Sequence, residues 1–372
     1  MNVVFAGGGT GGHLYPALAI AEEIRRRRPG AAITFIGTDR KLEARVVPRH
    51  GFDFAAINVR GFRRSISPGN LLFPATLLLA LWQSRRLLLR LKPDVVVGTG
   101  GYVCGPPLYV ASRLRIPTLI QEQNSYPGVT TRLLAGRVNE VHITFELTRK
   151  YLRPGARITV SGNPVRSAIG AVSREEGARA FGFDPARKTL LVVGGSLGAA
   201  SMNNAMIGAL EPLLADGIQV LWSTGEQELA RIQEAVKTRT AANPKLAVIL
   251  PYIADMEHAY AACDLAVCRA GATTLAELTK AGVPSVLVPY PFAAADHQRL
   301  NAQTMVEPGA ALLVADDEIG TGLLPTVRKL LADSGRLQAM AAHAKSLGKP
   351  DATQRIARSI LNLAGEGHDG AA

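Results

Sequence analysis

The feature that most constrains the fold is an alternation of short apolar, β-branched runs with longer helical patterns, which occurs twice along the chain. Apolar strands that alternate with helices are typical of βαβ units around a parallel sheet, because helices then cover both faces of the sheet. We therefore predict two series of buried strands. They lie at residues 3–6, 33–36, 95–98, 118–120, 141–144 and 158–160, and at residues 190–193, 220–222, 248–250, 265–268, 286–289 and 312–314.

Each series is long enough for one doubly wound domain, and the chain is therefore predicted to be an α/β protein with two Rossmann-like domains. The turn-forming triplet Gly162-Asn163-Pro164 marks the boundary. We expect an N-terminal domain at residues 1–163 and a C-terminal domain at 164–349, with a last helix at about 350–364 that packs back on the N-terminal domain. Two such domains facing each other form a cleft, and ligands bind at the carboxyl ends of the strands.

Both halves open with a strand, a glycine-rich turn and a helix. The turns read GGGTGGH at residues 7–13 and GGSLGA at residues 194–199. Glycines let backbone N–H groups approach a phosphate at a helix N-terminus, although a purely structural turn has the same pattern. A nicotinamide site also needs an acidic residue about 20 residues later. Asp39 lies 27 residues beyond Gly12, which argues against that cofactor.

His13 directly follows the first turn and begins a predicted helix. The positive end of the helix dipole favours a neutral imidazole, and a neutral imidazole can accept a proton as a general base. A capping or core histidine is the alternative. A second glycine-rich stretch, GTGGYVCGPP at residues 98–107, follows another strand of the same half. We expect the two stretches to hold a phosphorylated ligand through Gly9, Gly100, Gly101 and Tyr102.

The polar residues 121–124, QEQN, follow a predicted strand and are candidates for site lining. In the second half, RAGATTLAE at residues 269–277 follows a strand and opens a helix. Such a helix start offers N–H groups to a diphosphate, and Glu277, one turn further, can accept both hydroxyls of a ribose. A surface position is the alternative for Glu277. No His, Asp, Glu or Cys set has the spacing of metal ligands, so we predict no metal site.

The positive charge is concentrated in the first half. Residues 1–163 contain 23 Lys and Arg against 9 Asp and Glu, whereas residues 164–372 contain 19 against 21. Such asymmetry indicates an anionic partner of the first half, and without a nucleic-acid motif we expect no nucleic acid. The apolar run at 71–82 is shorter than the roughly 20 residues of a membrane-spanning helix. Because arginines flank it, we predict an interfacial membrane contact, besides a helix packed on the sheet, through Leu72, Phe73, Leu78, Leu79, Trp82, Arg85 and Arg86.

Seven motifs occur in the order found in one family: GGGTGGH, GTGGYVCGPP, QEQN, SGNPVR, GGSLGA, RAGATTLAE and PFAAADHQRLNA. From residue 2 to about residue 363 the chain resembles the MurG family of bacterial cell-wall N-acetylglucosaminyltransferases. The resemblance implies the GT-B glycosyltransferase fold. It also implies inverting transfer of GlcNAc from UDP-GlcNAc to the C4 hydroxyl of the muramoyl sugar of lipid I, which yields lipid II. The implied location is peripheral, on the cytoplasmic face of the cell membrane. The implied partners are an anionic lipid surface and other cell-wall synthesis proteins, and no cofactor is implied.

The resemblance also assigns roles to residues. His13 is implied as the general base or as the residue that orients the acceptor, and the first half is implied to hold the acceptor diphosphate. This chain has Leu197 where the family commonly has Gln in GGSQGA, so a side-chain contact of that Gln is not carried over. The residues implied to bind UDP-GlcNAc are Thr10, Gly11, Gly12, Asn124, Arg166, Ser196, Ile253, Ala272, Thr273, Thr274, Leu275, Ala276, Glu277 and Gln298.

Other functions remain open at this point. The same fold could serve a lipid glucosyltransferase or a UDP-GlcNAc epimerase, although an epimerase should lack the apolar and basic segment of the first half. A nicotinamide-dependent oxidoreductase and a non-catalytic UDP-sugar sensor are alternatives from other classes.

Overall fold

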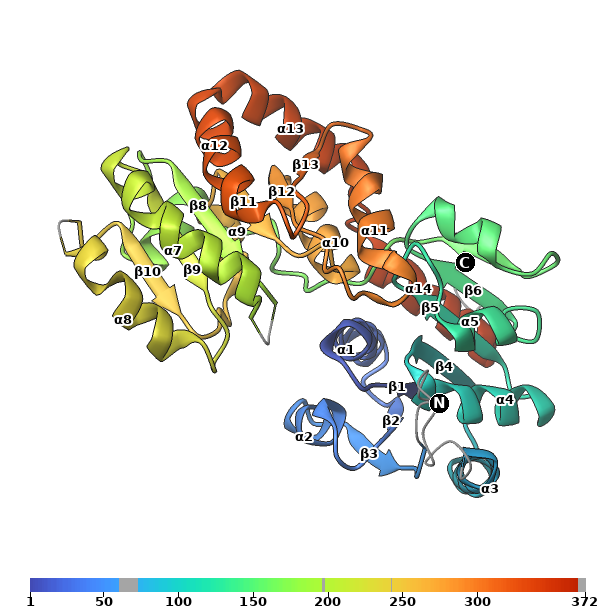
Figure 1. The fold of residues 1–372 in the computed structure, drawn as a ribbon. Coiled ribbons are helices and arrows are strands. Elements are labelled where there is room, and N and C mark those ends of the chain that lie inside the picture. The colour runs from blue at the N-terminus through green and yellow to red at the C-terminus, as the bar shows by residue number, and fades with distance from the viewer. Residues whose placement is uncertain (60–72, 196–197, 242, 367–372) are drawn as a thin grey trace. The chain divides into compact units, whose positions relative to one another are not determined.

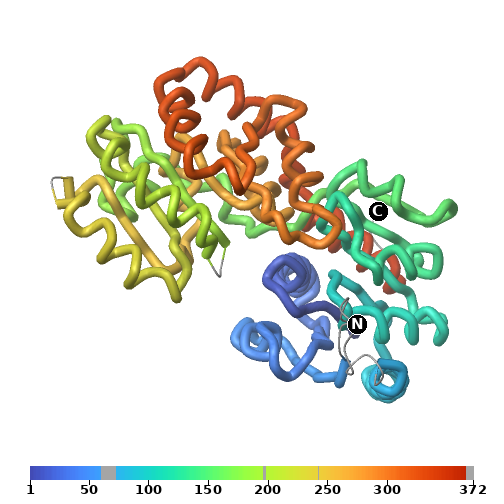
Figure 2. Tube along the Cα trace, in the orientation of Figure 1, coloured from blue at the N-terminus to red at the C-terminus, as the bar shows by residue number. Residues whose placement is uncertain are grey.

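The computed structural model describes residues 1–59, 73–195, 198–241 and 243–366. They form two compact units. Unit 1 contains Met1–Val165 and the segment that begins at Pro350, and unit 2 contains Arg166–Lys349. Figure 2 follows this division along the trace, with the last, dark red helix lying among the green and teal elements of unit 1.

Unit 1 is built on a parallel sheet whose strands read β3-β2-β1-β4-β5-β6-β7 from edge to edge over the described residues (Figure 1). The strands are apolar because helices bury both faces of the sheet. The six strands predicted in this half are all present. The strand bounds are β1 (Asn2–Gly7), β2 (Ala32–Gly37), β3 (Asp53–Ala56), β4 (Val95–Gly100), β5 (Thr118–Glu122), β6 (Glu140–Ile143) and β7 (Ile158–Val160).

Successive side chains of each strand point to opposite faces, so the sheet of unit 1 supports two cores. Val3 and Phe5 face a core that includes residues of α1 and α14, whereas Val4 and Ala6 face a core that includes residues of α3 and α4. The helices of unit 1 are α1 (Gly11–Arg27), α2 (Leu42–Arg49), α3 (Phe73–Leu91), α4 (Gly105–Arg113), α5 (Val129–Leu134) and α14 (Ala352–Leu361).

The last helix, α14, is part of the core of unit 1 although the 184 residues of unit 2, Arg166–Lys349, separate its segment from the rest of unit 1. Ile356 and Ile360 are fully buried on it, in the same core as Ile20 and Ile24 of α1. Because Ile356 and Ile360 lie four residues apart, they share one face of the helix. The chain thus leaves unit 1 after Val165 and returns to it at Pro350.

Unit 2 has a parallel sheet in the order β10-β9-β8-β11-β12-β13 over its described residues. Its six predicted strands are all found, with bounds shifted by one or two residues at some ends. The strands are β8 (Thr189–Val193), β9 (Gln219–Ser223), β10 (Ala247–Leu250), β11 (Leu265–Cys268), β12 (Ser285–Leu287) and β13 (Ala311–Leu313). The helices are α6 (Arg174–Ala180), α7 (Ala200–Ala215), α8 (Leu229–Thr240), α9 (Met256–Ala262), α10 (Ala272–Ala281), α11 (His297–Val306), α12 (Ile319–Ala332) and α13 (Ser334–Leu347).

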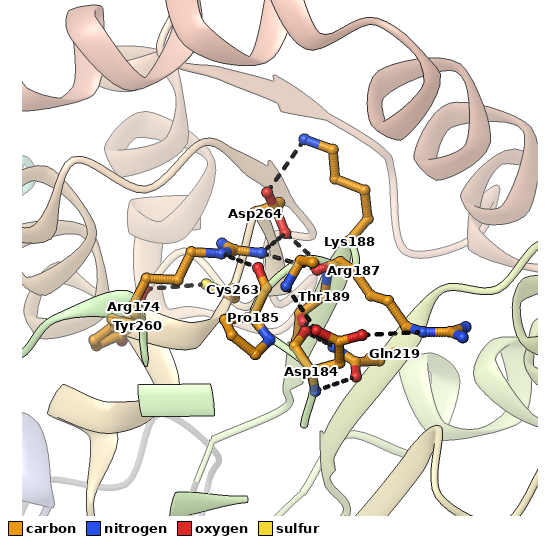
Figure 3. Close-up of polar contacts among 11 residues, drawn as sticks. Arg174, Asp184, Pro185, Arg187, Lys188, Thr189, Gln219, Tyr260, Cys263 and Asp264 are labelled. Carbon is orange, nitrogen blue, oxygen red and sulfur yellow. Dashed lines mark hydrogen bonds and ion pairs between the residues drawn. The ribbon is translucent and has the colours of Figure 1, made fainter. Parts of the chain in front are cut away.

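The amino-terminal edge of the sheet in unit 2 is fixed by an ionic cluster (Figure 3). One carboxylate oxygen of Asp264, just before β11, accepts hydrogen bonds of 2.8 Å from Arg174 and from the backbone N–H of Thr189. Its other oxygen lies 3.3 Å from the ammonium group of Lys188. These contacts satisfy the carboxylate within the protein, so this edge is structural and the opposite edge is left for a ligand.

Each sheet changes direction of winding beside its first strand. In unit 1 the chain moves outward from β1 to β2 and β3, and then returns to the other side of β1 as β4. In unit 2 the corresponding point lies between β8 and β11. Open α/β sheets bind ligands at the carboxyl ends of the strands at such a switch point. The glycine-rich turn at residues 7–13 begins at the end of β1, and Gly194 directly follows β8.

β3 was not predicted. Its sequence, Asp-Phe-Ala-Ala, is only four residues long and contains no β-branched residue. It forms because its backbone pairs with β2, with Phe35 opposite Phe54. Tertiary pairing therefore overrides the weak intrinsic preference of this segment.

Candidate functional site

The register of the sheet brings the two glycine-rich stretches of unit 1 together. β1 and β4 are parallel neighbours, and Gly7 at the end of β1 pairs with Gly100 at the end of β4. Gln121 and Glu122 end β5, the next strand in the sheet. The loops that carry Thr10, Gly11, Gly12, His13, Gly100, Gly101, Tyr102 and Asn124 therefore begin at one edge of one sheet.

Positions 100 and 101 require glycine because neighbouring atoms approach their backbone closely, in addition to their positive φ angles. Gly100 has φ +104°, and a Cβ atom there would lie 2.5 Å from Nδ1 of His13. Gly101 has φ +77°, and its Cβ would lie 2.6 Å from the carbonyl oxygen of Gly8. Both positions combine a positive φ with no room for a side chain. The second glycine-rich stretch thus admits the imidazole of His13 and the first loop.

His13 lies in the first turn of α1, partly buried, with Nδ1 2.8 Å from the amide oxygen of Gln123. Gln123 is 2% exposed and follows β5. Thr10, at the N-cap of α1, is exposed, and Gly12 is also exposed. His13 therefore lies between an exposed loop and a buried polar partner, Gln123. This arrangement suits a side chain that accepts and releases a proton.

An acidic residue that the sequence reasoning missed occupies the first glycine-rich loop. Glu43, at the start of α2, is 1% exposed. Its carboxylate accepts hydrogen bonds from the N–H of Gly9 at 2.9 Å and from the N–H and hydroxyl of Thr38 at 3.1 and 2.8 Å. The N–H of Gly9, which was expected to face a phosphate, thus donates to a carboxylate of the same unit.

One sequence signal could have led to Glu43. The dinucleotide-binding pattern requires an acidic residue after the second strand, and Glu43 is one of the acidic residues that follow β2. Asp39 was weighed for that place, but its side chain is 61% exposed and lies 3.9 Å from Arg40. The acid that reaches the loop lies four residues later, because α2 turns Glu43 back toward Gly9. Tyr102 faces the same region, and burial together with the charge of Glu43 raises the pKa of its hydroxyl.

In unit 2 a tyrosine holds Glu277, the residue that was predicted to bind a ribose. The hydroxyl of Tyr260, a buried residue of α9, donates a 3.0 Å hydrogen bond to Oε2 of Glu277 in α10. Burial raises the pKa of the Glu277 carboxyl, and the charge of Arg166 and the hydrogen bond from Tyr260 oppose that rise. Tyr260 was not singled out from the sequence, because nothing there distinguishes it from other apolar residues of a helix.

Arg166 is held close to the segment that contains Ile253. Its guanidinium donates to the carbonyl oxygen of Ala254 at 3.1 Å and lies 3.5 Å from the carboxylate of Glu257. Ile253 itself is 2% exposed. The ammonium group of Lys280 donates to the carbonyl oxygen of Arg166 at 2.9 Å. The structure therefore groups the predicted residues Arg166, Ile253 and Glu277 within one unit.

Arg269, to which the sequence gave no role of its own, connects four loops of unit 2. It follows β11 and is 12% exposed. It forms an ion pair of 2.5 Å with Asp316 and donates to the hydroxyl of Ser201 at 2.9 Å. It also donates to the carbonyl oxygen of Val288 at 3.2 Å. These partners follow β13, β8 and β12, so Arg269 sets the geometry of the carboxyl edge from which α10 begins.

Gln298 lies in the first turn of α11, and its amide oxygen accepts a 2.9 Å hydrogen bond from the N–H of Tyr290. This bond orients the side chain so that the amide nitrogen can serve as a donor. Ala295 and Asp296, just before it, have φ of +53° and +51°. Positive φ is costly for residues with a Cβ and is concentrated at functional sites. Ala272, Thr273, Thr274, Leu275 and Ala276 form the first turns of α10, and Ser196 lies outside the described residues.

The helix α3 presents apolar and basic side chains on its surface. Leu78, Leu79 and Trp82 are 67%, 43% and 57% exposed, and the guanidinium of Arg86 lies 5.7 Å from the centre of the Trp82 ring. Leu88 on the same helix is buried in the core, so α3 both packs on the sheet and shows an apolar surface. Arg85 and Arg86 are exposed, Phe73 is partly buried and Leu72 lies outside the described residues.

None of the helices among the described residues is long and apolar enough to cross a membrane. No group of three or more His, Cys, Asp or Glu side chains among these residues is placed to hold a metal ion.

Two family models match this chain and identify the class of protein to which it belongs. Residues 3–143 match the glycosyltransferase family 28 N-terminal domain, and residues 189–356 match the glycosyltransferase family 28 C-terminal domain. The two matches cover most of the chain, and each falls on one of the two Rossmann-like sheets. Together with the sites at the two switch points, they define a glycosyltransferase of the GT-B fold.

Individual relatives show which family of glycosyltransferases the chain belongs to. The chain is 41% and 45% identical to UDP-N-acetylglucosamine–N-acetylmuramyl-(pentapeptide) pyrophosphoryl-undecaprenol N-acetylglucosamine transferases of Acetivibrio thermocellus and Prosthecochloris aestuarii. The matches cover 98% of this chain and 98% and 99% of those proteins. The crystal structure of Acinetobacter baumannii MurG superposes with a TM-score of 0.76 at 30% identity, over 97% of this chain and 99% of that one. The chain therefore belongs to the MurG family.

The geometry around His13 predicts that Gly100→Ala will damage the site. The new Cβ would meet Nδ1 of His13 at 2.5 Å, and alanine would also be strained at φ +104°. We expect a loss of about 1–3 kcal/mol in the free energy of unfolding. Urea denaturation followed by circular dichroism measures it.

The control for this substitution is Gly105→Ala in the same stretch. Gly105 lies at the start of α4 with helical φ, and its Cβ would meet only Thr130, at 3.4 Å. We expect a change of less than about 0.5 kcal/mol. Equal effects of the two substitutions would contradict the close-approach argument.

Proposed function

We propose that this chain transfers N-acetylglucosamine from UDP-GlcNAc to the C4 hydroxyl of the muramoyl sugar of lipid I, which forms lipid II. The observation that carries this proposal is its full-length relation to transferases whose names state that donor and acceptor. The site geometry supports it, because each unit carries polar side chains at the switch point of its own sheet.

We assign the donor to unit 2. The first turn of α10 offers backbone N–H groups and the positive end of a helix dipole to a diphosphate. Glu277 lies further along the same helix, where its carboxylate can accept the two ribose hydroxyls while Tyr260 holds Oε2. Gln298 has its oxygen bound to Tyr290 and its nitrogen available for a sugar hydroxyl. Ser196 and the backbone of Ile253 remain assigned by family resemblance.

We assign the acceptor and the proton transfer to unit 1. His13 accepts the proton of the C4 hydroxyl while that oxygen attacks the anomeric carbon of GlcNAc. The bond from the anomeric carbon to the UDP oxygen breaks in the same displacement, and UDP leaves with the additional negative charge. An α-linked donor then yields a β-linked product in one step. The helix N-terminus stabilises the charge that develops on the leaving diphosphate.

The transfer assay tests this function. Labelled GlcNAc should pass from UDP-GlcNAc to a lipid I analogue, and His13→Ala should lower kcat by about 10²- to 10⁴-fold, the usual contribution of a general base. Glu277→Gln should instead raise KM for UDP-GlcNAc about 10- to 100-fold, since hydrogen bonds to a charged group contribute about 1.5–3 kcal/mol.

Glu234→Gln is the matched control, because the side chain of Glu234 is 78% exposed on α8. It should transfer at the wild-type rate. Consumption of UDP-GlcNAc without labelled lipid would contradict the proposal and would favour an epimerase.

The Tyr260–Glu277 contact predicts a shift in the pH dependence of donor binding. The ionised carboxylate accepts the ribose hydroxyls, so affinity for UDP is full above the pKa of Glu277 and falls as pH drops through it. The hydrogen bond from Tyr260 lowers that pKa. Tyr260→Phe should therefore raise it, and UDP binding should weaken at a higher pH than in the wild type. Calorimetric titration with UDP over a pH series measures the shift, and an unchanged profile would count against the assigned role of this contact.

Tyr109→Phe is the control, since it removes a hydroxyl from α4 in unit 1. Its pH profile for UDP binding should match the wild type. A shift in this variant equal to that of Tyr260→Phe would mean that the effect is not specific to Glu277.

We propose further that the α3 surface, formed by Leu78, Leu79, Trp82, Arg85 and Arg86, docks on an anionic membrane as a peripheral contact. Exposed apolar side chains beside arginines suit the boundary between headgroups and acyl chains. This contact supports a location on the cytoplasmic face of the membrane, where a lipid-linked acceptor is anchored. Association with other cell-wall synthesis proteins stays a prediction.

Vesicle sedimentation tests the α3 surface. The protein should bind vesicles rich in phosphatidylglycerol more tightly than vesicles of phosphatidylcholine. Arg85→Gln and Arg86→Gln should each weaken that binding about fivefold, because one basic residue contributes roughly 1 kcal/mol at an anionic surface. Trp82→Ala should weaken it through lost apolar burial.

Leu133→Ala on α5 is the matched control, since Leu133 is as exposed as Trp82, at 57%. It should leave vesicle binding unchanged. If it weakened binding as much as Trp82→Ala, the assignment to α3 would be wrong.

A further inference from the structure

A chain of buried amide side chains leads from the core of unit 1 to His13. Gln123 lies between Nδ1 of His13, at 2.8 Å from its amide oxygen, and the carbonyl oxygen of Thr99, at 2.7 Å from its amide nitrogen. The same nitrogen contacts the backbone and side-chain oxygens of Gln121. Gln121 in turn donates from its own amide nitrogen to Oδ1 of Asn163 at 3.1 Å. Gln121, Gln123 and Asn163 are at most 2% exposed.

The surroundings of Gln123 decide which way its amide points. A carbonyl oxygen can only accept a hydrogen bond, so the atom of Gln123 that faces Thr99 must be the NH₂ group. The backbone oxygen of Gln121 imposes the same choice. Reversing the amide would place its oxygen 2.7 Å from the Thr99 carbonyl oxygen, leaving two buried acceptors in repulsive contact. The amide oxygen of Gln123 therefore faces His13.

This orientation determines the tautomer of His13. An amide oxygen accepts but cannot donate, so Nδ1 of His13 must carry a hydrogen to complete the 2.8 Å contact. A neutral imidazole with hydrogen on Nδ1 has its lone pair on Nε2. Gly100 leaves space for the Nδ1 edge of the ring against the backbone of β4. His13 then donates to Gln123, Gln123 donates to Gln121, and Gln121 donates to Asn163, so each amide oxygen in the series accepts and each amide nitrogen donates.

We propose that Gln123 is a positioning residue that holds His13 in the Nδ1–H tautomer, so that Nε2 is the atom that accepts the proton of the acceptor hydroxyl. Gln123 does not touch the reacting atoms. It acts through the imidazole, as buried partners commonly fix the tautomer of a functional histidine. The catalytic part of this inference rests on the proposed function, whereas the tautomer assignment does not.

The tautomer is measured directly by long-range ¹H–¹⁵N NMR of the full chain labelled with ¹⁵N-histidine, and His13→Gln identifies the signal. We expect the Nδ1–H pattern in the wild type at a pH where the ring is neutral. Gln123→Met, which removes the acceptor at similar size, should give a mixture or the Nε2–H form. An Nε2–H pattern in the wild type, or no change in Gln123→Met, would overturn the assignment.

Kinetics test the consequence for catalysis. Gln123→Met should lower kcat for GlcNAc transfer about 10- to 100-fold, within the usual contribution of a general base, while KM for UDP-GlcNAc changes less than about twofold. Gln123→Glu should not restore kcat, because it keeps an oxygen toward His13 but places its second carboxylate oxygen against the Thr99 carbonyl oxygen, where the wild type has the NH₂ group. A wild-type kcat in Gln123→Met would contradict a positioning role.

Gln219→Met is the matched control. Gln219 is 1% exposed, and its amide bonds Asp184 and Thr189 at the amino-terminal edge of the sheet in unit 2 (Figure 3). It should lower the stability of unit 2 and leave both kcat and the His13 signal unchanged. If His13→Ala kept full activity, the proposed catalytic role would fail while the measured tautomer would still decide the structural inference.

Discussion

The parallel pairing of β1 with β4 is the constraint on which the site of unit 1 depends. It aligns Gly7 with Gly100, and the loops that follow them have to share the same small space. Only glycine at positions 100 and 101 lets the imidazole of His13 and the carbonyl of Gly8 approach so closely. The register thus brings two local turns into one site, and Gln123 reaches this site from the residue that follows β5, the next strand of the sheet.

Buried carboxylates serve this chain in two different ways. Glu43 is surrounded by the N–H of Gly9 and by the N–H and hydroxyl of Thr38, so its hydrogen-bonding capacity is largely used within unit 1 and it shapes the glycine-rich loop. Glu277 is held by Tyr260, and burial raises its pKa. A carboxylate that is anchored but not saturated suits the binding of hydroxyls. The same side-chain chemistry therefore stabilises one loop and serves as a candidate ligand in the other unit.

Several parts of the site could be read from motifs because the chemistry requires local spacing. His13 follows its glycine turn directly, and Glu277 lies one turn beyond the start of its helix, so each is visible in a short stretch of sequence. Glu43 and Tyr260 were not singled out in this way, and Arg269 and Gln123 lie in quoted motifs whose spacing did not reveal their partners. Each acts on a residue brought to it by the fold, as Gln123 does on His13 across 110 positions of the chain. Asp39, the acidic residue considered from the sequence, is exposed, whereas Glu43 makes the contact with the loop.

The sequence by itself determined the fold class and nearly all of the strands, because apolar runs of five or so residues between helical patterns can be buried in few other ways. It missed β3, whose four residues form a strand only when β2 is beside them. The tertiary structure alone decided which polar groups meet, since that depends on strand order and register, which bring distant residues to the same edge of a sheet. It also decided the orientation of the Gln123 amide, and with it the tautomer of His13, because only the surrounding buried carbonyl oxygens distinguish the two ends of an amide.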